Sequence, residues 1–106
     1  MAEQYGIKET SEALTGMRVL SVAGYKAMKV VPEGEDWKTP ANLTRIGQEF
    51  ARQLIANPEK AEKVKAGFDN AGQIVNEVKD LSIREGVTLG IQAVDEVKTA
   101  FEEIAA

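Results

Sequence analysis

The sequence contains neither cysteine nor histidine. Without cysteine the chain can form no disulfide and no thiolate site, so the redox compartment cannot be read from it. Because both residue types are missing, the usual nucleophile–base pairs are excluded, and a metal site would depend on carboxylates alone. The densest acidic group, Glu33, Glu35 and Asp36, lacks the twelve-residue ligand spacing of an EF-hand. We therefore predict no catalytic residue, no cofactor and no metal site.

Long apolar runs and aromatic residues are also scarce. No uncharged apolar run reaches the roughly 18 residues that a membrane-spanning helix needs. The first residues, Met-Ala-Glu-Gln-Tyr-Gly, lack the basic and apolar regions of a signal peptide. We expect an intracellular, soluble protein that does not bind membranes. Aromatic residues make up 6% of the chain, so its core must consist of aliphatic and small residues.

Basic residues are outnumbered by acidic ones, 13 against 17, which gives a formal charge of −4. The whole acidic excess lies in residues 57–106, since basic and acidic residues cancel in residues 1–56. Nucleic-acid binding through phosphate contacts requires a basic face, which this charge distribution does not provide. We predict neither a nucleic-acid partner nor a small-molecule substrate.

Apolar residues in the second half recur in steps of three and four, which is typical of one side of an α-helix. Glycines within these stripes and within the first predicted helix predict close packing against neighbouring helices. We expect both stripes to face inward. The first stripe consists of Ala61, Val64, Phe68, Ala71, Val75 and Val78, and the second of Ile83, Val87, Gly90, Val94, Val97, Phe101 and Ile104.

Breaks between the helical patterns define the predicted fold. Two prolines and a glycine interrupt any helix across a loop at 32–39, where Thr39 is the expected N-cap of the next helix. Asn57 precedes Pro58 as another cap, and Ser82 has capping-box spacing to Glu85. The sequence predicts one all-α domain over residues 1–106, a compact bundle of four helices. Their predicted ranges are about 10–29 (capped by Thr10 or Ser11), 40–56, 58–79 and 83–104, with the last two forming an antiparallel hairpin.

Residues 66–71, Ala-Gly-Phe-Asp-Asn-Ala, and residues 77–86, Glu-Val-Lys-Asp-Leu-Ser-Ile-Arg-Glu-Gly, form a recognisable layout. This layout resembles small, all-helical proteins encoded by bacteriophages, and the likeness extends over most of residues 13–97. Residues 32–37 differ from the Asp-Gly-Lys loop of that pattern. The resemblance implies a virion or assembly component, located in the host cytoplasm or the virion, and no catalytic residue.

These observations predict a non-enzymatic structural or assembly subunit that docks on itself or on other assembly subunits. A soluble helical adaptor or regulator that binds one protein partner reversibly is the alternative. Burial of the apolar residues outside the stripes would favour the adaptor, whereas one exposed patch of them would favour assembly. Trp37 is either a lid on the bundle or an anchor in a partner's pocket. The candidate protein-binding residues are Trp37, Glu35, Asp36, Val19, Val22, Leu89 and Ile91.

Overall fold

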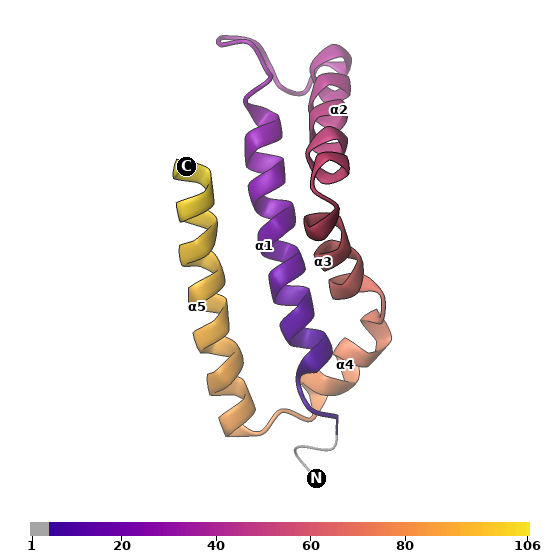
Figure 1. The fold of residues 1–106 in the computed structure, drawn as a ribbon, viewed down its shortest axis with the longest axis vertical. Helices are drawn as coiled ribbons and strands as arrows, with labels where there is room; N and C mark the ends of the chain where they lie inside the picture. The colour runs from indigo at the N-terminus through magenta and orange to yellow at the C-terminus, as the bar shows by residue number, and fades with distance from the viewer. Residues whose placement is uncertain (1–4) are drawn as a thin grey trace.

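The computed structural model describes residues 5–106, and this part of the chain is helical without any strand. Five helices follow one another: α1 (Lys8–Met28), α2 (Pro40–Ala56), α3 (Pro58–Phe68), α4 (Ala71–Lys79) and α5 (Ile83–Ala105). They form an elongated helical bundle in which α1 runs one way, α2 to α4 return, and α5 runs parallel to α1 (Figure 1). The all-α prediction is confirmed, but the predicted count of four helices is wrong.

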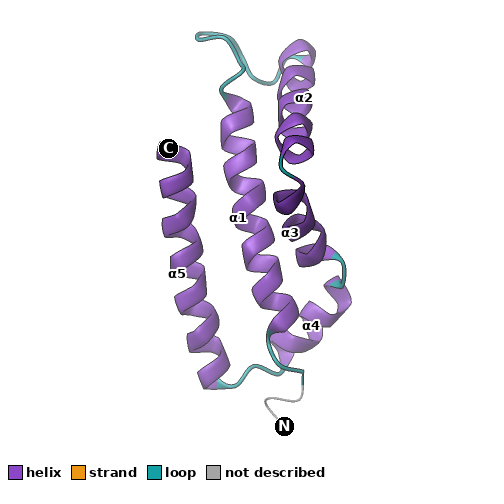
Figure 2. Cartoon of the chain, viewed as in Figure 1, coloured by secondary structure: helices purple, strands orange, loops and turns teal. Residues whose placement is uncertain are grey.

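The extra helix arises because the predicted helix over 58–79 breaks at Asp69 and Asn70 (Figure 2). Asp and Asn side chains compete with the backbone for hydrogen bonds, so they favour helix ends over helix interiors. The backbone carbonyl of Asn70 accepts a hydrogen bond from the backbone N–H of Gln73, at 3.0 Å, and so begins the first turn of α4. The break turns α4 toward the first turn of α1.

That turn places Glu77 of α4 at the N-terminus of α1. Its carboxylate accepts hydrogen bonds from the backbone N–H of Glu9, at 3.1 Å, and from the N–H and hydroxyl of Thr10, both at 2.8 Å. Glu77 thereby binds N–H groups that have no partner within the helix and lies near the positive end of the helix dipole. The predicted cap at Thr10 or Ser11 is wrong, because α1 begins at Lys8 and this carboxylate from α4 takes the capping role.

Other helix ends follow the sequence more closely. The Thr39 hydroxyl accepts from the N–H of Asn42, and Ser82 forms the predicted capping box with Glu85. Asn57 is an exception, since its side chain makes no cap hydrogen bond and donates to the Gln53 carbonyl of the preceding helix. The helix starts at residues 40, 58 and 83 are therefore correct, although one of the expected caps is not.

The buried apolar core lies mainly on α1, which is flanked by α2 and α3 on one side and by α5 on the other (Figure 1). Because α1 has neighbours on two sides, its buried residues cover more than one stripe, while its apolar residues Met17 and Met28 are exposed. The principal contacts of α5 are with α1, so the predicted hairpin is wrong in its packing although its two arms run antiparallel. The buried apolar residues are Ala13, Val19, Val22, Ala23, Ala27 and Leu89.

Glycines set the distance between α1 and α3. A Cβ added at Gly67 would lie 2.7 Å from the backbone oxygen of Glu12, and one added at Gly16 would lie 3.3 Å from that of Lys63. The predicted close approach is confirmed at these two positions. At Gly72, Gly86 and Gly90 a Cβ would meet no atom within 4 Å, so close packing within the chain does not explain these residues.

Candidate protein-docking site

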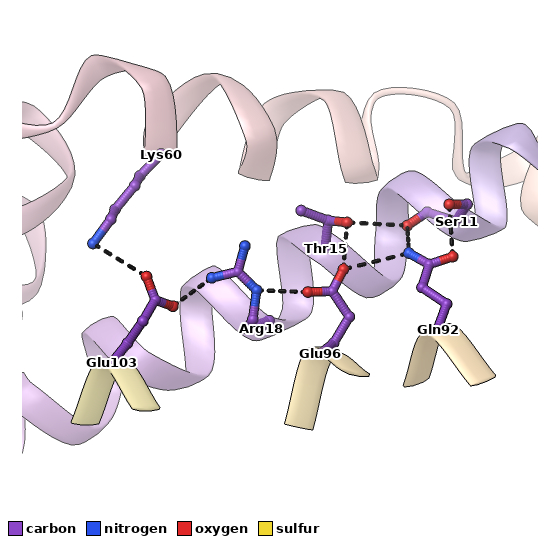
Figure 3. A network of polar contacts seen from close by, with 7 residues as sticks. All are labelled: Ser11, Thr15, Arg18, Lys60, Gln92, Glu96 and Glu103. Carbon is purple, nitrogen blue, oxygen red and sulfur yellow. Dashed lines mark hydrogen bonds and ion pairs between the residues drawn. The ribbon is translucent and has the colours of Figure 1, made fainter. Parts of the chain in front are cut away.

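Helix α5 has two unlike faces, and the polar one faces α1. Arg18 of α1 lies between two carboxylates of α5, pairing through Nε with Glu96 at 2.6 Å and through a terminal nitrogen with Glu103 (Figure 3). The side chains of Arg18 and Glu96 are only 11% and 17% exposed. Lys60 of α3 reaches the other oxygen of Glu103 at 4.0 Å. Glu96 and Glu103, the two carboxylates of α5 that face Arg18, are therefore both paired with a cation.

Uncharged partners extend this network toward the start of α1. The Thr15 hydroxyl donates to Glu96 at 2.6 Å. Gln92 donates to the backbone carbonyl of Ser11 at 2.9 Å and accepts from its hydroxyl at 2.7 Å. Ser11, Thr15 and Arg18 are spaced four and three residues apart, so they form one stripe along α1 (Figure 3). We call Ser11, Thr15, Arg18, Gln92, Glu96 and Glu103 the polar seam.

The ionised forms of the seam's charged groups are favoured. Burial acts to raise the pKa of Glu96, but hydrogen bonds from Thr15, Arg18 and Gln92 and the charge of Arg18 outweigh it and lower the pKa. Burial likewise acts to lower the pKa of Arg18, and the hydrogen bond to Glu96 and the two carboxylate charges raise it. The seam is a structural contact whose charges stabilise one another.

Most of the apolar face of α5 points away from α1 into solvent. The prediction that the second stripe faces inward is therefore wrong for all but its last residue, because the polar stripe of α1 selects the opposite face of α5. Gly90 is also exposed, and Ile104 is half-buried. The large apolar residues on this face are between 56% and 89% exposed: Ile83, Val87, Ile91, Val94, Val97 and Phe101.

The first stripe is only partly inward as well. Val64 is half-buried at the contact of α3 with α1, but Phe68, Val75 and Val78 are each about half exposed, between 44% and 52%. The break after Phe68 separates the two halves of this stripe, so one continuous inward face cannot form. Exposed apolar surface is thus found on α3 and α4 as well, but its longest unbroken run is on α5.

An apolar groove runs along one edge of that face, between α1 and α5. Its α1 side includes Leu14 and Met17, and Met17 is 53% exposed. The α5 side is formed by Ala93, Glu96, Val97, Ala100, Phe101 and Ile104. The groove and the outward stripe adjoin, because they share three residues of α5. We call the outward stripe Ile83, Val87, Gly90, Ile91, Val94, Val97, Phe101 and Ile104 the α5 docking face.

Of the predicted apolar binding residues, only Ile91 belongs to this face, at 61% exposure. Val19 and Val22 are each 3% exposed and Leu89 is 8% exposed, so all three belong to the core of the isolated chain. They lie outside the predicted stripes because the stripe pattern assumes that each helix buries one side only. The polar spacing of Ser11, Thr15 and Arg18 was the signal that could have identified the seam.

The predicted residues of the loop are not part of the docking face and lie at the end of the molecule where α1 connects to α2 (Figure 2). Asn42 is 1% exposed and donates to the Glu35 carboxylate at 3.1 Å and to the Asp36 carbonyl at 2.9 Å. The Asp36 carboxylate accepts from the N–H of Lys38 at 2.9 Å. Glu35 and Asp36 therefore shape the loop, and Trp37 between them and α2 is 48% exposed.

Residues 5–106 hold no group of three or more acidic side chains arranged to bind a metal ion. Within the same range, no helix combines the length and the hydropathy needed to cross a bilayer. In comparisons with known proteins, no family model, no curated protein and no solved structure matches the chain.

Proposed function

We propose that this protein is a non-enzymatic assembly subunit that joins other subunits through the α5 docking face. The observation that carries the proposal is the orientation of α5, which turns Glu96 and Glu103 toward Arg18 of α1 and exposes its longest apolar stripe. Large apolar patches on a protein surface mark interaction sites. Covering each of the six large side chains would regain about 1–2 kcal/mol, scaled from full burial by their exposure.

The resemblance of residues 66–86 to small helical phage-encoded proteins supports a place for this subunit in a phage particle or its assembly. In that role the chain acts by surface matching: the docking face is covered by a neighbour, while the acidic residues on the outer sides of α5 stay hydrated. Such a subunit needs no cofactor and no substrate.

The experiment is light scattering coupled to size-exclusion chromatography over a wide concentration range. We expect a discrete multiple of the 11.5 kDa chain mass. Val94→Asp, at a site 68% exposed on the docking face, should shift the protein toward the monomer. Ile55→Asp is the matched control, because Ile55 is 79% exposed on α2 and away from that face. Circular dichroism of each variant checks that the helices are retained.

An oligomer that Val94→Asp leaves intact would refute assembly through the α5 docking face, and a monomer at every concentration would refute the assembly subunit itself. The second candidate is then a soluble adaptor that binds one different protein reversibly. Burial of Val19, Val22 and Leu89 favours this candidate, since it leaves those residues unavailable for assembly. An adaptor would be monomeric alone and would associate only when its partner is added.

A further inference from the structure

The α5 docking face has the spacing of a coiled-coil seam. From Ile83 to Ile104 its positions advance by four and three residues in strict alternation, through Val87, Gly90, Val94, Val97 and Phe101. This average of 3.5 residues is the repeat that keeps one helix in contact with another along its whole length. The face therefore fits a helix of similar length as its partner. A flat or irregular surface would not follow the repeat.

Gly90 shows where this partner approaches most closely. It lies mid-helix in α5, where glycine weakens a helix, and a Cβ added there would meet nothing within 4 Å. The chain itself thus gains no packing from this glycine. Phe101, 66% exposed, is the largest side chain on the same face, eleven residues further along. One helix face therefore carries both a notch and a side chain large enough to fill it.

We infer that the occupant of the α5 docking face is α5 of a second copy of this chain, antiparallel to the first, with Phe101 of each copy over Gly90 of the other. This inference rests on the proposed assembly function and names its partner. Layers that pair a large residue with a small one interdigitate without voids. The same register places Val94 against Val97 of the second copy, and Val87 against Ile104.

Other ways of pairing two α5 helices fit less well. In a parallel pair, Gly90 would face Gly90 and leave a gap, while Phe101 would crowd against Phe101. Moving the antiparallel pair by one heptad would place Arg84 beside Lys98 of the second copy, and like charges at such positions oppose pairing. In the register proposed here, Lys98 lies beside Ile91 of the second copy. Both size and charge thus select one arrangement.

Small residues flank the α5 docking face on the side that is nearer to α1. Gly86, Ala93 and Ala100 recur every seven residues beside the docking face, and the last two also line the groove with α1. Short side chains at these positions let the second α5 approach without meeting bulky neighbours. Apolar side chains of α1 along the groove, Leu14 and Met17, extend the contact beyond α5 itself.

Cysteine cross-linking tests this register, because the chain has no cysteine of its own. Two single variants, Val87→Cys and Ile104→Cys, are oxidised separately and as an equal mixture. A disulfide requires Cα atoms within about 7 Å. Since opposite ends of α5 meet in the antiparallel pair, we expect a covalent dimer in the mixture and at least tenfold less in either variant alone. The control is a mixture of Asp95→Cys with Ile104→Cys, because Asp95 is exposed and lies outside the docking face.

Each other outcome overturns the inference in a recognisable way. A dimer that forms in each single variant alone would indicate parallel pairing. Cross-linking of Val87→Cys with Val97→Cys, and not with Ile104→Cys, would indicate the shifted register. In both cases the proposed assembly function would stand. An oligomer by light scattering that cross-links in none of these combinations places self-assembly on another surface, whereas a monomer by light scattering refutes the assembly function as well.

A second variant tests the notch without cysteine chemistry. Gly90→Leu fills the space reserved for Phe101 of the second copy, while leucine favours the helix of the single chain. We expect the dissociation constant of the dimer to rise at least tenfold while the helical signal of the monomer is unchanged or increased. An unchanged dissociation constant would overturn the pairing of Gly90 with Phe101.

Discussion

Replacing Glu96 by alanine tests whether the polar seam holds α5 in the observed orientation. Glu96 accepts from Arg18 and Thr15, each at 2.6 Å, and from Gln92 at 3.3 Å. In Glu96→Ala these three donors lose their acceptor within a contact where Arg18 is only 11% exposed. The seam then carries a cation with one carboxylate partner in place of two.

The size of the stability loss in Glu96→Ala depends on the contacts that Arg18 and Thr15 keep. Removing one partner of a buried ion pair costs about 3–5 kcal/mol, and a hydrogen bond to a charged group is worth about 1.5–3 kcal/mol. Arg18 keeps Glu103, and the Thr15 hydroxyl still reaches the Ser11 carbonyl at 3.4 Å, so the loss is smaller than for a fully broken pair. We expect Glu96→Ala to lower the free energy of unfolding by about 2–3 kcal/mol. For a domain of this size, the melting temperature falls by on the order of 10–20 °C.

Thermal and urea unfolding followed by circular dichroism measure this loss, at a fixed protein concentration because self-association contributes to stability. Glu102→Ala is the matched control, since Glu102 is an exposed glutamate on the same helix. We expect it to change the free energy of unfolding by less than about 0.5 kcal/mol. If Glu96→Ala changed the free energy of unfolding as little as this control, the polar seam would not be what holds α5 against α1. The orientation that exposes the docking face would then be refuted.

Two further predictions concern pH and helix contact. The pKa of Glu96 is lowered on folding, so its contribution to stability is present above about pH 4.5, the unfolded value, and is lost as pH falls through the lower folded value. Urea midpoints measured from about pH 7 to about pH 3 should therefore fall less steeply in Glu96→Gln than in the wild type, and equal slopes would contradict this. Gly67→Ala forces a Cβ to 2.7 Å from the Glu12 carbonyl and should destabilise by about 1–3 kcal/mol. In Gly72→Ala the added Cβ meets no atom within 4 Å, so this variant should raise the free energy of unfolding by about 0.5–1 kcal/mol. Equal effects of the two substitutions on the melting temperature would refute the close contact of α1 with α3.

Much of the fold could be predicted from local signals in the sequence. Pro40 and Pro58 each occupy the first position of a helix, and Ser82 with Glu85 forms a capping box, so three helix starts could be predicted from a few neighbouring residues. These devices act through the backbone within one turn and need no tertiary context. The break at Asp69 and Asn70 was missed because the apolar stripe continues through it in the sequence.

The orientation of α5 could not be read in the same way. Hydrophobic periodicity indicates which residues share a face, but it does not indicate whether that face is covered by the chain's own helices or by a partner. The deciding information is the polar stripe of Ser11, Thr15 and Arg18 on α1, which is 78 to 81 residues away in the sequence from Gln92 and Glu96 in α5. Only a comparison of two distant helices shows that their polar faces match.

The two faces of α5 depend on each other. A helix with one charged stripe and one apolar stripe would ordinarily bury the apolar stripe, since exposing it gives up the hydrophobic contribution. In this chain α1 supplies Arg18, two hydroxyls and a backbone carbonyl in register with Gln92, Glu96 and Glu103, so the charged stripe is satisfied in the interior. The apolar stripe is thereby left for a neighbour. If the docking face is covered in the assembly, a break in the seam should weaken association as well as folding, because α5 can then rotate its apolar face toward α1.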